Sequence, residues 1–260
     1  MDYRNKVILV TGASSGIGRA TAIALSHHDN TLVITARRQA LLDKTVELIR
    51  VNGSQCLAIA GDALAEGHAD SVVNRMVELY GRIDIAILNI GIGPPSNTLT
   101  TPKETLLYCM RANYDSMINF FCPLIRQMKQ QTTPSMIAHM NSQATYFGIP
   151  MQGDYTAAKG AARLFLETAR MELRHFGFNH IKIQTIHPGF VDTEICRNDG
   201  LPKPNEISED KAAEYVLKGL LSEVRENLFP PGTKWATLLG RIIPHAVLTR
   251  VLLSTVPDKY

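Results

Sequence analysis

The stretch Thr11-Gly12-Ala13-Ser14-Ser15-Gly16-Ile17-Gly18 decides the fold expected for this chain. An apolar run over residues 7–10 precedes it, and an apolar pattern at helical spacing follows over residues 17–28. Glycines at a strand-to-helix turn let backbone N–H groups approach a pyrophosphate, and the helix N-terminus adds partial positive charge. The alternative is a tight turn that binds nothing. Its place between the first strand and the first helix favours a dinucleotide site.

Short β-branched runs alternate with longer stretches at helical spacing along most of the chain. The strand-like runs cover residues 7–10, 32–35, 56–60, 83–88, 135–139, 181–186 and 227–229. The helical stretches cover about residues 17–28, 39–51, 64–80, 103–130, 154–176 and 208–225. This order predicts an α/β fold, a single-domain doubly wound parallel sheet (Rossmann fold) with helices on both faces. We expect residues 1–230 to form the dinucleotide-binding and catalytic domain, with residues 231–260 as a helical tail attached to it.

Composition excludes several classes of protein. A net charge of +3 over 260 residues, with scattered Lys and Arg, does not indicate nucleic-acid binding. The four cysteines lie far apart without a CxxC motif, which indicates neither a metal site nor a disulfide framework; they are Cys56, Cys109, Cys122 and Cys196. The N-terminus enters an apolar strand directly and shows no secretion signal. We therefore expect a cytoplasmic protein, or one on the cytosolic face of a membrane.

The glycine spacing TGxxxGxG resembles that of the short-chain dehydrogenase/reductase family, and the chain length and element order agree with it. The resemblance implies that the turn contacts the dinucleotide through Gly12, Ser14, Ser15, Gly16, Ile17 and Gly18. In the family, the end of the second strand lies beside the adenosine ribose, where a carboxylate favours NAD and an arginine favours NADP.

Here the second strand ends in Ala36-Arg37-Arg38, without an acid. A planar guanidinium suits the 2′-phosphate of NADP through paired, charge-assisted hydrogen bonds. We therefore predict NADP(H) as cofactor, with Arg37 as the main contact and Arg38 as either a second contact or a solvated surface charge. Ser15 stands where many family members carry a basic residue.

Three further positions resemble cofactor contacts of the family. Asp62 follows the third strand and matches the aspartate that meets the adenine edge; it also suits the N-cap of the next helix. After the fourth strand, Asn89 and Gly91 match a motif that usually reads Asn-Asn-Ala-Gly. Leu88 and Ile90 replace the first asparagine and the alanine of that motif.

The catalytic prediction rests first on Tyr155 and Lys159, which lie four residues apart and hence on one helix face. A phenol with a pKa of about 10 is a poor base near neutral pH, whereas a neighbouring ammonium favours the phenolate. A Tyr–Lys pair on a helix is common, so the other family residues are what distinguish this one. Ser142 lies just beyond the fifth strand, and Asn113 lies within the long fourth helix.

The resemblance assigns each of these residues a role. Tyr155 protonates the carbonyl oxygen during reduction, and Ser142 donates a hydrogen bond to the same oxygen. Lys159 holds the nicotinamide ribose and tunes Tyr155, while Asn113 anchors a water that links Lys159 to solvent. Hydride arriving at a carbonyl carbon leaves charge on oxygen, which requires a placed donor and a proton.

The sixth strand leads into a segment that resembles the cover of the nicotinamide. Its expected contacts are Pro188, Gly189, Val191 and Thr193. His187 stands just before them and is interpreted as structural rather than as an acid–base group, because Tyr155 is available. His139 lies within a strand and is interpreted as a packed core histidine.

Substrate specificity should reside beyond the carboxyl ends of the strands. The segments expected there are 92–98, 144–154 and a lid-like insertion over 194–208. The middle segment is apolar, through Tyr146, Phe147, Ile149 and Met151. This character fits a hydrophobic carbonyl substrate, or else side chains that pack under the lid.

The tail repeats apolar residues at helical spacing and contains no acidic residue from Asn227 to Pro257. Pro244 and two arginines argue against a membrane span. The tail caps the substrate pocket, packs in an interface between copies, or lies on a membrane surface. We expect a homo-oligomer, a dimer rather than a tetramer.

Together these features predict an NADP(H)-dependent oxidoreductase that reduces a ketone or an aldehyde, with a lipid, acyl or steroid-like compound as candidate substrate and no metal. An alcohol dehydrogenase working in the oxidative direction is one alternative. A dinucleotide-sensing scaffold without turnover is the other.

Overall fold

The computed structural model describes residues 2–194, 203–254 and 256, and its centre is one sheet of parallel strands. The strands are β1 (Val7–Thr11), β2 (Thr31–Ala36), β3 (Gln55–Ala60), β4 (Ile85–Leu88), β5 (Ser135–Met140), β6 (Ile181–Pro188) and β7 (Glu226–Phe229). They lie in the order β3-β2-β1-β4-β5-β6-β7, and all the neighbouring pairs are parallel. The predicted doubly wound parallel sheet is confirmed.

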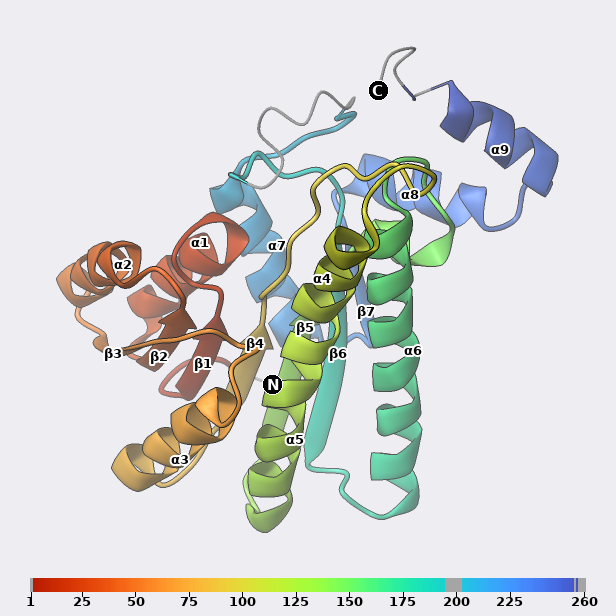
Figure 1. Ribbon diagram of the computed structural model, residues 1–260. Coiled ribbons are helices and arrows are strands. Elements are labelled where there is room, and N and C mark those ends of the chain that lie inside the picture. The colour runs from red at the N-terminus through yellow and green to blue at the C-terminus, as the bar shows by residue number, and fades with distance from the viewer. Residues whose placement is uncertain (1, 195–202, 255, 257–260) are drawn as a thin grey trace.

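Helices cover both faces of this sheet (Figure 1). One face carries α1 (Gly16–Leu25), α2 (Gln39–Val51) and α7 (Glu209–Ser222). The other carries α3 (His68–Tyr80), α5 (Asp115–Gln130) and α6 (Gly153–His175), with α4 (Lys103–Asn113) packed against α5 and α6. Two short 3₁₀ turns follow α1 and β5; they are η1 (Ser26–His28) and η2 (Gln143–Tyr146).

The central strand β1 shows why the sequence requires two helical layers. Ile8 and Val10 pack into the core beneath α1, α2 and α7, whereas Val7 and Leu9 pack into the core on the opposite face. All five residues of the strand are buried. A strand that is apolar on both faces loses water contact only when both faces are covered.

The predicted helix over residues 103–130 is wrong in one respect, because it is two helices, α4 and α5, that meet at Tyr114. The side-chain amide of Asn113 donates to the carbonyl of Cys109, 2.9 Å away, and to that of Ile92, 2.7 Å away. Such local side-chain bonds compete with the regular helix ladder. Asn113 is thereby fixed at the end of α4 rather than in the middle of a longer helix.

The predicted helix over residues 64–80 starts later, at His68, and its N-cap is Gly67. The N-cap interpretation of Asp62 is therefore wrong. Its carboxylate instead accepts a hydrogen bond from the backbone N–H of Leu64, at 3.0 Å, in a turn before the helix. Other ends differ slightly: β4 begins at residue 85 rather than 83, and α7 ends at residue 222 rather than 225.

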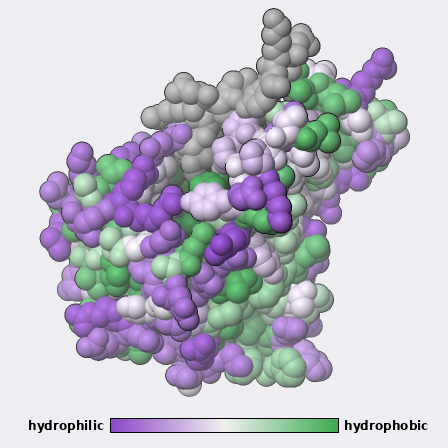
Figure 2. Space-filling model, in the orientation of Figure 1, coloured by the Kyte–Doolittle hydropathy of each residue, from purple (hydrophilic) through white to green (hydrophobic). Residues whose placement is uncertain are grey.

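The tail forms two further helices, α8 (Pro231–Gly240) and α9 (His245–Leu253). Figure 1 shows α9 at the upper right, away from the sheet, and Figure 2 shows several hydrophobic side chains in that region. Among the described residues, none of the helices is long and apolar enough to cross a membrane. Part of the predicted lid, residues 195–202, lies outside the described residues.

Candidate active site

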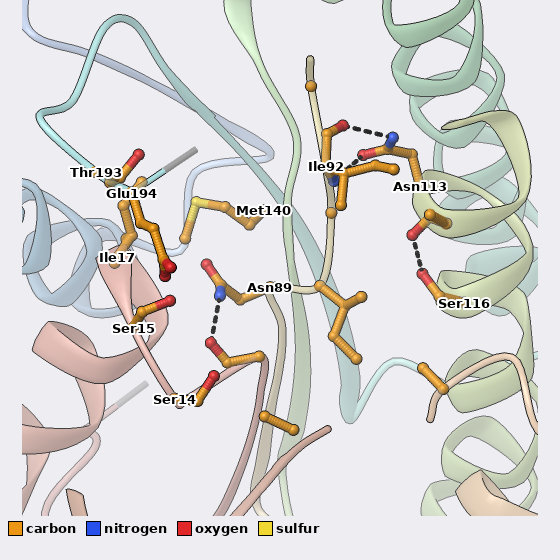
Figure 3. A pocket seen from close by; sticks show the side chains of 18 of the residues that line it. Ser14, Ser15, Ile17, Asn89, Ile92, Asn113, Ser116, Met140, Thr193 and Glu194 are labelled. Atoms are coloured by element: carbon orange, nitrogen blue, oxygen red, sulfur yellow. Dashed lines mark hydrogen bonds between the residues drawn. The ribbon is translucent and has the colours of Figure 1, made fainter. Parts of the chain in front are cut away.

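A cavity of about 400 Å³ opens at the carboxyl ends of the strands and gathers nearly all the predicted site residues. Its predicted lining residues are Gly12, Ser14, Ser15, Gly16, Ile17, Arg37, Arg38, Asp62, Asn89, Gly91, Asn113, Ser142, Tyr155, Lys159, Pro188, Gly189, Val191 and Thr193. Gly18 alone among the predicted residues is not in the lining. Figure 3 shows Ser14, Ser15 and Ile17 on one side, Asn113 and Ser116 on the other, and Asn89 between them.

The glycine turn is shaped to bring backbone, not side chains, to this cavity. Gly12 and Gly16 have φ of +67° and +61°, a region that side-chain-bearing residues rarely adopt. The N-cap of α1, Ser15, makes no side-chain hydrogen bond to the first turn of the helix. The helix N-terminus therefore opens toward the cavity with backbone donors available for an anion.

Asn89 connects the end of β4 to the glycine turn. Its backbone N–H donates to Thr11 Oγ1 at 2.9 Å, and its side-chain amide donates to the carbonyl of Gly12 at 3.2 Å. A Cβ at Gly18 would collide with this amide and with the Gly12 carbonyl. Gly18 thus does not line the cavity. The absence of a side chain at this position lets α1 pack closely against Asn89.

The two arginines after β2 have different partners. Arg37 donates to the hydroxyl of Tyr108 at 3.0 Å. Arg38 donates to Ser15 Oγ at 2.7 Å and forms a 2.8 Å ion pair with Glu194. Arg38 therefore lies directly beside the glycine turn, but its side chain is exposed, so both interpretations of this residue stay open.

Tyr155 and Lys159 both project from the first turns of α6 into the cavity. The ammonium of Lys159 lies 5.8 Å from the centre of the Tyr155 ring and donates to the carbonyl of Met140 at 2.9 Å. The Tyr155 ring lies against Gly93, where a Cβ would come within 3.2 Å of it. Burial lowers the pKa of Lys159 to about 8.

Asn113 faces Lys159 across Gly91. A Cβ placed at Gly91 would lie 2.7 Å from Asn113 Oδ1 and 3.1 Å from Lys159 Nζ. Asn113 is fully buried, and its Oδ1 also accepts from the backbone N–H of Ile92 at 3.3 Å. Both polar groups therefore lie directly against Gly91, where a side chain would force one of them to shift.

Ser142 stands at the end of β5, where its backbone carbonyl meets His187. The Nδ1 atom of His187 lies 3.0 Å from that carbonyl oxygen. Burial lowers the pKa of His187 to about 4, and the ring does not line the cavity. His139 is also buried, and burial places its pKa well below the ordinary value. Both rings are therefore neutral and lie behind the site.

The apolar residues predicted for the substrate segment do not line this cavity. The Tyr146 hydroxyl donates to Glu226 at 2.9 Å, and the Phe147 ring packs where a Cβ of Gly240 would lie, in α8. Met151 is buried. Tyr146 and Phe147 thus pack against β7 and α8, and the alternative of packing under the lid falls partly on residues 195–202, outside the described residues.

Several lining residues were not predicted, among them Tyr108, Ser116 and Met140. Glu194 was predicted as the start of the lid-like segment, not as a partner of Arg38. Met140 adjoins a predicted motif, so position along the chain offered a signal. Tyr108 and Ser116 lie on α4 and α5 and reach the site only through helix packing, for which no sequence spacing gives a signal.

This arrangement of a parallel sheet, a glycine turn and a Ser–Tyr–Lys group is typical of an oxidoreductase that binds a nicotinamide dinucleotide. The chain belongs to the short chain dehydrogenase family, whose profile it matches over residues 6–202.

Relatives and solved structures agree with this assignment. An uncharacterized oxidoreductase of Listeria monocytogenes is 33% identical over 86% of both chains. An alcohol dehydrogenase of Thermococcus sibiricus, complexed with 5-hydroxy-NADP, is 25% identical with a TM-score of 0.76, covering 86% of this chain and 94% of that one. A short chain dehydrogenase/reductase of Burkholderia phymatum, in complex with NAD, shares the fold with a TM-score of 0.85 and 19% identity over 100% and 99% of the two chains.

Proposed function

We propose that the protein is an NADP(H)-dependent reductase of a ketone or an aldehyde, with Tyr155 as proton donor. The observation that carries this proposal is that Ser142, Tyr155, Lys159 and Asn113 line the same cavity as the glycine turn. A scaffold that only senses the dinucleotide needs the turn and a group that holds the ribose, but it does not require the Ser142 hydroxyl or a proton donor at Tyr155. Their presence around one cavity favours turnover.

The residues present fit a dinucleotide. The N-terminus of α1, which has no side-chain cap, and the backbone at Gly12 and Gly16 suit a pyrophosphate. Asp62 lines the same cavity, where it would hold the adenine edge. Gly189 and Val191 line the part nearest β6, where they would cover the nicotinamide.

The preference for NADP(H) is supported by the pair of arginines after β2. Arg37 and Arg38 both line the cavity, and the second strand ends without an acid beside the ribose position. Two guanidinium groups suit a 2′-phosphate. Glu194 forms an ion pair with Arg38 and so opposes the binding of a phosphate by that arginine. Arg37 therefore remains the main contact in this proposal.

The chain's own groups perform the proton chemistry. When bound, the nicotinamide supplies the hydride. Tyr155 gives its phenolic proton to the substrate oxygen, and the Ser142 hydroxyl donates a hydrogen bond to that oxygen as charge develops. Lys159 keeps positive charge next to Tyr155 and holds the ribose. Asn113 lies across Gly91 from Lys159, where it would hold a water that passes protons to solvent.

The proposed substrate is hydrophobic, of the lipid, acyl or steroid-like kind. Support comes from Ile90, Ile92, Met140 and Val191, which give the cavity apolar walls around the polar catalytic groups. The same site would oxidise an alcohol if the cofactor were supplied as NADP, so an alcohol dehydrogenase is the second candidate.

The test is NADPH oxidation over a panel of ketones, quinones, β-ketoacyl thioesters and sterols, with the purified protein and its Tyr155→Phe variant. We expect turnover of an apolar carbonyl compound that the variant reduces at least about 100-fold more slowly. Cofactor binding, followed by NADPH fluorescence, should be equal in the two proteins. Turnover by the variant within a few-fold of wild type would exclude the mechanism. Binding without any turnover would favour the scaffold, and NADH affinity equal to that for NADPH would overturn the cofactor assignment.

A further inference from the structure

The two tail helices differ in how they are held. Helix α8 is anchored next to the active site, because Thr237 hydrogen-bonds to Gln143 at 2.5 Å and Gly240 lies against Phe147. Gly189 of the cavity lining also lies directly against Thr233 at the start of α8. Helix α9 follows after Pro244 and touches α8 through Leu248.

No side chain of helix α9 is fully buried, although Leu248, Thr249 and Leu252 are half-buried. The helix is 9 residues long, and isolated helices shorter than about 12 to 15 residues are marginal in water. Stability for such a helix comes from an apolar face that packs on something. The rest of the described residues leaves most of α9 exposed, so its outer side is available to another surface.

The uncovered side chains form an apolar surface that we call the tail face. Trp235 is 67% exposed and Ile242 is 79% exposed, although both are among the most hydrophobic residue types. The tail face consists of the exposed residues Trp235, Leu239, Ile242, Val247, Val251 and Leu253. In Figure 2 green side chains gather at the upper right, where Figure 1 places α9. Large apolar side chains exposed in this number on two neighbouring helices mark an interaction site.

The charged side chains within the tail helices are basic. Lys234, Arg241 and Arg250 lie in or beside α8 and α9, and the sequence has no Asp or Glu from Asn227 to Pro257. Exposed apolar residues flanked by basic ones match a bilayer surface with anionic headgroups, which attracts the bases while the apolar side chains enter the acyl boundary.

We propose that the tail face docks on an anionic lipid surface. A second copy of this chain is the other candidate, but a twofold interface sets the same patch against itself, and the tail helices offer no Asp or Glu to pair with Lys234 and Arg250. Charge complementarity therefore favours the lipid. Because α8 contacts Gly189 and Gln143, docking would also place the active site beside the membrane, where apolar carbonyl compounds dissolve.

Trp235 provides a direct readout, since it is the only tryptophan in the sequence. Its emission should shift to the blue when the full-length protein meets vesicles of phosphatidylglycerol, and the protein should sediment with them. Vesicles of phosphatidylcholine alone should give neither effect. Raising the salt concentration to 1 M should weaken the binding, because screening shortens the range of charge attraction. The readout involves no turnover, so it is independent of the proposed enzymatic function.

Two variants separate the apolar and charged contributions. Ile242→Asp should weaken vesicle binding at least about tenfold, and Arg250→Gln by about fivefold. Val51→Asp and Lys44→Gln, at exposed positions of α2, are the matched controls and should bind as wild type does. Circular dichroism should confirm that each variant is folded. Absence of binding to the anionic vesicles would overturn the proposal. So would a dimer, seen by analytical ultracentrifugation, that Ile242→Asp dissociates.

Discussion

His187 holds the backbone at Ser142, because its Nδ1 atom lies 3.0 Å from the carbonyl oxygen of Ser142. The carbonyl accepts, so Nδ1 carries the proton and donates. The other ring nitrogen faces Glu226 at 3.8 Å, and the ring is fully buried. Burial keeps the ring neutral by lowering its pKa to about 4, with Arg163 and Arg170 acting in the same direction. Protonation of His187 at low pH would therefore put a charge on the ring that contacts Ser142.

The first prediction is that the protein loses stability as the pH falls from about 6.5 to 4. In this range the unfolded chain takes up a proton at His187 that the folded protein does not, so lower pH favours unfolding. The difference between a pKa near 6.5 and one of about 4 corresponds to roughly 3 kcal/mol. Buried His139 acts in the same direction. Urea unfolding measured at several pH values checks this.

A His187→Asn variant tests which group is responsible. Asparagine keeps a donor for the Ser142 carbonyl but does not titrate, so the free energy of unfolding should depend less steeply on pH between 6.5 and 4. Glu226 has a lowered pKa, and its contribution is lost only below about 4.5, which separates the two windows. An unchanged slope in the variant would assign the effect to other groups.

The second prediction concerns the cofactor charge. Arg37→Ala should raise the KM for NADPH by roughly 10- to 100-fold, because a charged hydrogen-bond donor to the 2′-phosphate is lost. The KM for NADH should change little. Arg75→Ala is the control, since it removes an exposed arginine paired with Glu78 far from the cavity. Equal losses for both cofactors would contradict the assignment.

The third prediction is that removing the charge of Glu194 strengthens NADPH binding, whereas removing Arg37 weakens it. Glu194 pairs with Arg38 at 2.8 Å, so Glu194→Gln should release that guanidinium for the phosphate. The pair is largely exposed, and the expected gain in NADPH affinity is therefore modest, about two- to fivefold. Fluorescence titration with NADPH and with NADH measures it. A loss of NADPH affinity would instead show that Glu194 positions Arg38 for binding.

The fourth prediction uses the close approach at Gly91. A methyl group there would meet Asn113 Oδ1 at 2.7 Å and Lys159 Nζ at 3.1 Å, so Gly91→Ala must displace one of them. We expect turnover to fall about 100-fold, since a shift of 1 Å in catalytic geometry costs that much. Gly160→Ala is the control, because its added methyl meets only the Thr145 carbonyl, at 3.8 Å. Comparable losses in both variants would contradict this account.

The order of strands and helices was predictable because each element buries a periodic set of side chains. In β1, for example, Ile8 and Val10 pack into the core on one face of the sheet. Val7 and Leu9 pack into the core on the other face. Ends of elements were less predictable. The break at Tyr114 depends on a hydrogen bond from Asn113 to Ile92, a residue 21 positions away, which no local pattern contains.

The site was predictable where residues lie in the chain order of a known motif. The glycine turn, Ser142, Tyr155 and Lys159 all meet in one cavity because parallel strands end on the same side of the sheet. The partners of these residues were not predictable. Glu194 beside Arg38 and His187 beneath Ser142 are contacts set by tertiary packing.

The last prediction separates the function of Lys159 from its contribution to stability. Its ammonium is buried, and its pKa of about 8 lies below the ordinary value of 10.5. At pH 7 the lysine is protonated in both states, and burying the charge costs roughly 3 kcal/mol. The unfolded chain binds the extra proton between pH 8 and 10.5, so that cost disappears as the pH rises through this range.

Lys159→Met keeps the volume and removes the charge, at the loss of one hydrogen bond to Met140 of about 1 kcal/mol. The variant should therefore be more stable than wild type by about 2 kcal/mol at pH 7, and no more stable at pH 10.5, while reducing no carbonyl substrate. Lys44→Met, on exposed α2, should show no pH-dependent difference from wild type. If Lys159→Met were destabilised equally at both pH values, the buried charge would not cost stability. Lys159 would then be a structural residue rather than one kept for the reaction.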